Sequence, residues 1–233
     1  MRLNLKSNWN RFWFEAPADY ALAFLRIALC VLLLFQAVTI TSYFWELYGE
    51  WGILEKPLHD YFRSSVLPSI SLIHSTLGSL GLSYDSIALG LFVAYVCSIL
   101  LLLVGWKTRL SAFLVWGFHY VLLNSSEHAN YGVDRFFHIF LFYFCWMPAG
   151  EVWSWSRQKE PAAQWFKSLS IRLVQLHLCV VYLDAGMSKA LGATWWNGEA
   201  MWRALMLPEF RQFDLSWMAS AVWVPMLLGW TTV

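Results

Sequence analysis

Long apolar runs alternate with short polar segments along the chain, and the length of the runs predicts helices that cross a membrane. A helix needs about 20 mostly apolar residues to cross a hydrocarbon core of about 30 Å. Six runs approach or reach this length: Ala21–Ile40, Ser86–Trp106, Leu110–Leu123, Phe136–Met147, Ile171–Leu191 and Leu215 to Val233. The third and fourth are short, and we expect each to be extended by a turn or packed inside the bundle. The pattern predicts an all-α, polytopic transmembrane helix bundle with about six spans.

The segment 41–85, between the first two runs, is long for a loop. Its mixed apolar and polar pattern predicts one or two amphipathic helices on the outer surface, or a re-entrant piece over the bundle. Repeats and low-complexity linkers are missing elsewhere in the sequence, so 1–233 is expected to form a single transmembrane domain. The last run reaches Val233 without a polar cap, which is the pattern of a truncated chain.

The distribution of Lys and Arg predicts the orientation, because cytoplasmic loops carry the excess of these residues. With the N-terminus inside, the cytoplasmic side holds Arg2, Lys6, Arg11, Lys107, Arg109, Arg157, Lys159, Lys167 and Arg172. The outer side then holds Lys56, Arg63, Arg135, Lys189, Arg203 and Arg211. The bias favours a cytoplasmic N-terminus.

Composition agrees with a membrane location and excludes other classes. Only 13% of the residues are charged, against about 25% in soluble domains. Many of the aromatic residues, which include 16 tryptophans, lie near the ends of apolar runs, where lipid headgroups are expected. A net charge of +1 without a basic tract excludes a nucleic-acid-binding surface. Four dispersed cysteines form neither a disulfide framework nor a metal-binding pattern, so we expect no metal site.

Two polar patches are predicted to emerge on the same outer face. One is the loop NSSEHANYGVDR, which contains His128, Asp134 and Arg135. The other is the end of the fifth run, which carries Lys189. Patches that approach each other at one face of a bundle can form a pocket, whereas patches at opposite faces cannot.

Lys189 allows two interpretations. It can extend its ammonium to the membrane surface, because it lies near the end of an apolar helix. It can also act as an amine base, since burial disfavours the charged form of a lysine. His128 could then share or orient the proton. Tyr182 lies one heptad before Lys189 on the same helical stripe, and Trp195 and Trp196 follow shortly after.

Other ionisable residues in the apolar runs have structural alternatives. Arg26, alone within the first run, pairs with a buried acid or carbonyl, or holds an anionic or quinone oxygen. His138 and His74 lack a partner at useful spacing, and we interpret both as packing residues.

These residues together resemble the vitamin K-dependent gamma-carboxylase-like membrane family, also called the horizontally transferred transmembrane (HTTM) domain family. The most specific segment is RLVQLHLCVVYLDAGMSKALGATWWNGEAM. Weaker similarity lies in LRIALCVLLL, GIL, VGWKTRLSAFLVW and NSSEHANYGVDRFFHIFLFYFCWMPAG.

The resemblance implies a chemistry for these positions. In the animal carboxylases a lysine at the position of Lys189 deprotonates reduced vitamin K, and oxygen addition then generates a strong base. That base removes a proton from a glutamate, carbon dioxide adds, and the quinol leaves as an epoxide. A histidine that assists matches His128, and an aligned tyrosine matches Tyr182. The implied cofactor is reduced vitamin K or menaquinone, with O2 and CO2 as co-substrates, and the implied pocket includes Asp134, Arg135, Arg26, Trp195 and Trp196.

Two departures from the family change the expected activity. The family has two adjacent lysines, whereas Ser188 precedes Lys189 here, and the large domain that presents glutamates is missing from the sequence. One hypothesis is therefore a quinol-dependent oxygenase, or a carboxylase whose small or peptide substrate another protein supplies. The alternative is a scaffold, maturation or immunity factor that binds a secreted peptide or a neighbouring membrane protein through segment 41–85. Under either hypothesis the protein lies in the lipid bilayer, which in a bacterium would be the inner membrane.

Overall fold

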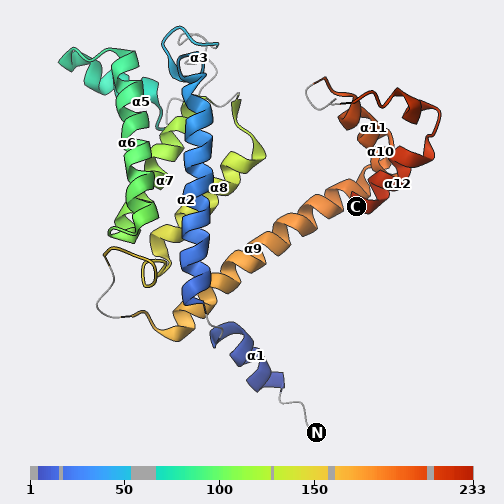
Figure 1. The fold of residues 1–233 in the computed structure, drawn as a ribbon, viewed down its shortest axis with the longest axis horizontal. Helices are drawn as coiled ribbons and strands as arrows, with labels where there is room; N and C mark the ends of the chain where they lie inside the picture. The colour runs from blue at the N-terminus through green and yellow to red at the C-terminus, as the bar shows by residue number, and fades with distance from the viewer. Residues whose placement is uncertain are drawn as a thin grey trace. The chain divides into compact units, whose positions relative to one another are not determined.

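The computed structural model describes residues 5–15, 18–53, 67–126, 129–156, 161–208 and 213–232. All regular secondary structure in these ranges is helical. The chain divides into two compact units, Met1–Arg172 and Leu173–Val233, and the boundary falls within the long helix α9, Gln164–Leu191 (Figure 1).

A bundle of four helices forms the body of the first unit. The helices are α2 (Asp19–Thr41), α6 (Tyr84–Val104), α7 (Thr108–Ser125) and α8 (Gly132–Trp146). Helix α7 packs along α6 on one side and along α8 on the other, and α2 packs against α6 (Figure 1). The shorter elements of this unit are α1 (Leu5–Phe14), α3 (Phe44–Tyr48), α5 (Ile70–Leu77) and η1 (Gly78–Leu80). Segment 41–85 thus contains short helices, while its central residues, 54–66, lie outside the described ranges.

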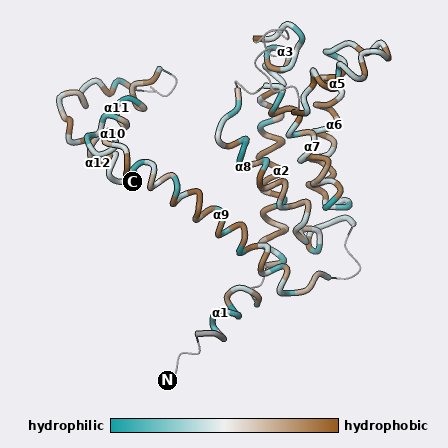
Figure 2. The backbone as a smooth tube through the Cα atoms, turned by 180° about the vertical axis from the view of Figure 1, so that it is seen from behind, coloured by the Kyte–Doolittle hydropathy of each residue, from teal (hydrophilic) through white to brown (hydrophobic). Residues whose placement is uncertain are grey.

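Helix α2 carries apolar side chains on both its buried and its exposed face, with Arg26 and Gln36 as polar exceptions. Its buried stripe repeats every three or four residues and includes Leu22, Leu29 and Leu33. The opposite face exposes large apolar side chains, among them Phe35 at 69% and Val38 at 67%. Figure 2 shows hydrophobic residues along much of α2 and α6.

Three described helices, α2, α6 and α9, are long and apolar enough to cross a membrane, which indicates a membrane protein. Helix α7 has 18 residues and α8 has 15. At 1.5 Å per residue, α8 is about 22 Å long and falls short of a hydrocarbon core of about 30 Å.

The bundle is closed at the N-terminal end of α2 by the loop between α8 and α9. Arg26, fully buried, donates from Nη1 to the Ala149 carbonyl at 3.1 Å and from Nη2 to the Trp153 carbonyl at 2.5 Å. Gly105 ends α6 with φ of 77°, and a Cβ at this position would come within 2.7 Å of Arg26 Nη1. Glycine therefore meets both the backbone and the space requirement. Nearby, Lys167 pairs with Asp19 at 2.7 Å and with Glu151 at 2.5 Å.

The second unit contains the C-terminal part of α9 and several short elements: α10 (Ala193–Trp196), α11 (Glu199–Met206), η3 (Ser216–Ala219) and α12 (Trp223–Thr232). The expected single helix from Leu215 onward is wrong, because η3 and the ten-residue α12 occupy this region instead. Pro225 lies in the first turn of α12, where the missing N–H of proline costs no helical hydrogen bond. Val233 lies outside the described residues.

Candidate functional site

A polar pocket lies within the helix bundle, towards the end opposite to Arg26. Its volume is about 110 Å³. Its polar lining comes from every helix of the bundle and from α3, and consists of Gln36, Tyr48, Tyr95, His119, Ser126, Asn130 and Asp134. Such a concentration of polar groups between apolar helices is costly and marks a functional site by default.

Asp134 is fixed at the entrance to α8 by two hydrogen bonds. The Gln36 side-chain amide donates to its Oδ1, which ties α2 to α8, and the Tyr131 N–H donates to its Oδ2 at 2.6 Å. Asp134 is only 7% exposed. A carboxylate in the first turn of a helix is also favoured by the helix dipole. The pocket therefore holds a buried carboxylate in a defined orientation.

Two tyrosine hydroxyls contribute to the pocket. The Ser126 hydroxyl donates to Tyr48 Oη at 3.3 Å. Burial raises the pKa of Tyr48, while the Ser126 hydrogen bond acts in the opposite direction, so the phenol stays neutral and can donate its own proton. Tyr95 is 2% exposed, and among the described residues none lies within hydrogen-bond reach of its Oη. A buried hydroxyl normally has a partner, so this group calls for water or a ligand.

A second cavity, of about 370 Å³, is lined by residues of α7, of α8 and of the loop between them. We call it the aromatic cavity, and its lining includes Tyr120, Asn124, Asn130, Arg135 and His138. The rings of Tyr120 and His138 stack with centroids 5.1 Å apart, and Trp116 stacks on His138 at 5.3 Å. The cavity therefore combines flat rings with amide and guanidinium groups.

The two spaces meet at a pair of histidines. His119 lines the polar pocket and His138 lines the aromatic cavity. Their Nδ1 atoms are 3.5 Å apart, and the rings are nearly parallel, at 15°. Asn130 lines both spaces and donates to the Leu123 carbonyl at 2.9 Å.

Two consecutive residues of α8 line different spaces, the polar pocket and the aromatic cavity. Asp134 lines the polar pocket and Arg135 lines the aromatic cavity, where it is exposed. These two are the sequence-predicted residues that lie at the bundle site. His128, the predicted proton partner, lies outside the described residues.

Lys189 belongs to the second unit, where it bridges α9 and α12. Its Nζ donates to the Thr232 carbonyl at 3.0 Å and lies 4.9 Å from the centroid of the Trp195 ring. Trp196 supports the same corner: its Nε1 donates to the Ala190 carbonyl at 2.7 Å, and its carbonyl accepts from Trp230 Nε1 at 3.0 Å. Trp195 and Trp196 therefore fix the surroundings of Lys189.

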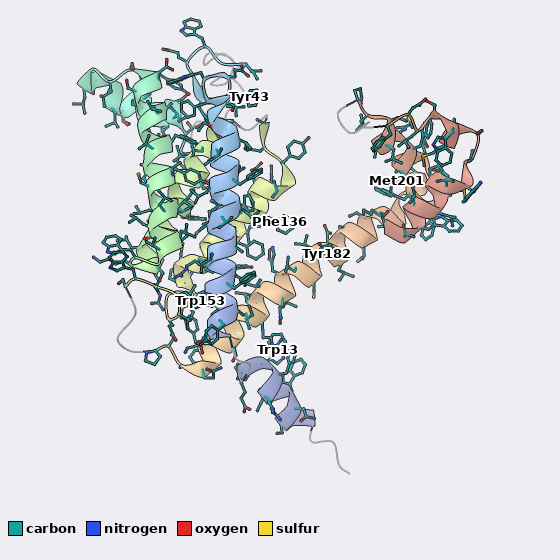
Figure 3. All side chains as sticks on the ribbon, in the orientation of Figure 1. Trp13, Tyr43, Phe136, Trp153, Tyr182 and Met201 are labelled. Atoms are coloured by element: carbon teal, nitrogen blue, oxygen red, sulfur yellow. The ribbon has the colours of Figure 1, made fainter. Side chains whose placement is uncertain are left out.

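Tyr182 and Arg26 take part in none of these contacts. Tyr182 lies midway along α9 and is 76% exposed (Figure 3). Arg26 and Gln36 are ten residues apart on α2, or about 15 Å along the helix. The hydrogen bonds of Arg26 go to the loop carbonyls described above, and these contacts are those of a structural residue.

The sequence analysis did not predict four residues of the bundle site, which are Gln36, Tyr48, Tyr95 and His119. His138, interpreted as a packing residue, does stack on Trp116 and Tyr120 but also faces His119 and lines a cavity. One signal was present, because Asp134 and His138 are four residues apart and share a helix face. Within the described ranges, no group of three or more His, Cys, Asp or Glu side chains could hold a metal ion.

The chain matches no family model, no curated protein and no solved structure.

Proposed function

We propose that this chain is a multi-pass membrane protein that binds a reduced quinone and uses it in an oxygen-dependent reaction, with Lys189 as the base. The observation that carries the proposal is the aromatic cavity in the bundle. Its volume of about 370 Å³ lies within the range of about 300–1,000 Å³ that small-molecule sites occupy.

The residues of the aromatic cavity suit a quinol headgroup. Such a headgroup is flat, aromatic and polar at two opposite oxygens. Tyr120 and His138 offer rings for stacking. Arg135 offers guanidinium donors to a quinol oxygen, and the side-chain oxygens of Asn124 and Asn130 offer acceptors. Bound quinol would supply the reducing electrons and the hydroxyl proton for reaction with O2, with CO2 as the further substrate of a carboxylation.

Lys189 acts in this proposal on the outer side of the membrane, assisted by His128. In this proposal α2, α6, α7, α8 and α9 cross in turn from a cytoplasmic N-terminus, which puts the C-terminal end of α9 and the N-terminal end of α8 on the outer side. The Lys189 Nζ donates to the Thr232 carbonyl and lies over the Trp195 ring. Acceptance of a proton from quinol therefore requires that the amine first releases its own proton and its hydrogen bond to α12. Tyr182, Trp195 and Trp196 stay predictions of the family resemblance, whereas Arg26, which holds the loop carbonyls, has no part in the cavity that carries this proposal.

A scaffold function is the second candidate, and exposed aromatic and aliphatic side chains favour it. Trp45, Trp51 and Ile53, at the start of segment 41–85, are 52%, 79% and 69% exposed. Such a patch suits a secreted peptide or a neighbouring membrane protein as partner. The protein would then hold its partner at the outer surface of the membrane, a bacterial inner membrane in this proposal, without turnover of quinol.

Binding of quinol separates the two candidates. The purified protein in lipid nanodiscs is titrated with reduced menaquinone, and quenching of tryptophan fluorescence is followed. Tyr120→Ala should weaken binding about tenfold, which corresponds to about 1.4 kcal/mol. Tyr43→Ala is the matched control, because Tyr43 is 60% exposed on the turn before α3 and lies outside the cavity lining (Figure 3). Equal affinities of the two variants would place the quinol elsewhere, and lack of binding by the wild type would favour the scaffold.

A further inference from the structure

The paired histidines of α7 and α8 occupy the boundary between two polar spaces, and the proposed quinol function makes no use of this arrangement. His119 faces the polar pocket and His138 faces the aromatic cavity, with Nδ1 atoms 3.5 Å apart. A neutral imidazole has one N–H donor and one acceptor nitrogen. Because the two Nδ1 atoms face each other, a favourable contact requires one to carry a proton and the other to lack it.

The polar pocket has room and partners for water. Its volume of about 110 Å³ exceeds the share of three water molecules in the liquid, at about 30 Å³ each. Tyr95 is a lining residue with an exposed fraction of 2%, and its buried hydroxyl has no hydrogen-bond partner in the part of the chain that the structure describes. Water bound there would satisfy Tyr95 and would reach the Tyr48 hydroxyl and the Asp134 carboxylate.

We propose that the polar pocket holds water and that the His138–His119 pair carries protons between this water and the aromatic cavity. A proton that binds the second ring nitrogen of His138 makes the ring cationic, and the Nδ1 proton then passes to Nδ1 of His119. His119 releases a proton from its own second nitrogen to the pocket water. One proton enters and one leaves, and no electron moves. The inference is independent of which ligand occupies the cavity.

The titratable groups around the pair are defined. On the pocket side they are Tyr48 of α3, Tyr95 of α6 and Asp134 of α8. On the cavity side they are Tyr120 of α7 and Arg135 of α8. Asp134 is the acidic group of this set and lies on the pocket side, whereas the guanidinium of Arg135 lies on the cavity side and disfavours a second positive charge there.

Nitrogen NMR of the whole protein in lipid bilayers tests the pair directly. With histidine labelled with 15N, we expect one Nδ1 of the pair to be protonated and the other unprotonated, and water magnetisation to reach the His119 ring. Signals are assigned by single replacement of each histidine. Protonated Nδ1 atoms on both rings, or on neither, would overturn the proposal.

Exchange into D2O tests the route. The His119 ring proton should exchange about tenfold or more slowly in His138→Phe, which keeps a flat ring but removes the proton carrier. His138→Gln should slow this exchange as well, and it serves as the test of the route if His138→Phe does not fold. His74→Phe is the control, since His74 lies on α5 against Tyr84 and lines neither space. Unchanged exchange in both His138 variants would overturn the route.

Discussion

The ammonium of Lys189 lies over the ring of Trp195, 4.9 Å from its centroid, and donates to the last described carbonyl of α12, that of Thr232. The segment that follows the fifth apolar run therefore folds back so that its own aromatic residues and α12 hold the lysine. Gly198 makes this fold possible, because it adopts φ of 80° and a Cβ there would come within 2.6 Å of the Met226 nitrogen. Trp195 and Trp196 thus surround Lys189, and Gly198 allows the close approach of α12.

Replacement of Arg26 by methionine should destabilise the first unit by about 2 kcal/mol, because one buried and one part-buried hydrogen bond to loop carbonyls are lost. The 149–156 loop should also become more accessible to protease. Unfolding in mixed detergent micelles measures the free energy. The control is Val31→Met on the exposed face of the same helix, which should change stability by no more than about 0.5 kcal/mol. An unchanged free energy of unfolding in Arg26→Met would show that the loop is held in place without the Arg26 hydrogen bonds.

Asp134→Ala should lower the free energy of unfolding by about 2 kcal/mol, because the amide of Gln36 and the N–H of Tyr131 both lose their acceptor. Asp134→Asn keeps one acceptor oxygen and should cost about half as much. Detergent unfolding measures both variants against the wild type. Equal stability of all three would show that the link between α2 and α8 contributes nothing.

Cysteine labelling tests the proposed orientation. Ser79 lies in η1, and Trp155 lies in the loop between α8 and α9, so the two positions mark opposite ends of the bundle. A cysteine at Ser79 should react with a membrane-impermeant reagent added to intact cells, and a cysteine at Trp155 should react only after the membrane is permeabilised. The reverse pattern would place the N-terminus outside and would contradict the proposed location of Lys189.

The sequence predicted α2 and α6 to within two residues, whereas the longest helix, α9, begins at Gln164, seven residues before the predicted run Ile171–Leu191. The apolar run Ala21–Ile40 became α2, Asp19–Thr41, and the run Ser86–Trp106 became α6, Tyr84–Val104. In both cases the length of the run is set by the membrane, so each boundary falls within two residues of the prediction. The last run misled us because its composition is apolar throughout, while Pro225 marks the start of a new helix.

The bundle site was only partly predictable. Asp134 and Arg135 were visible as charges next to an apolar run, but their different neighbours depend on how α8 rotates against α7 and α2. The contact between His119 and His138 joins residues 19 apart on different helices. Hydropathy describes which residues avoid water, and it contains no information on which faces of two apolar helices meet.

The direct test of the proposed function is the formation of quinone epoxide by the purified protein, supplied with reduced menaquinone and oxygen and followed by mass spectrometry. The wild type should produce epoxide, and Lys189→Met should lower the rate about a hundredfold or more, as expected for loss of a general base. Lys107→Met is the matched control, because the Lys107 ammonium also lies over a tryptophan ring, 5.0 Å from the centroid of Trp106, and it should retain the wild-type rate. Absence of epoxide from the wild type, or an equal rate in Lys189→Met, would contradict the assignment of Lys189 as the base of a quinol-dependent enzyme.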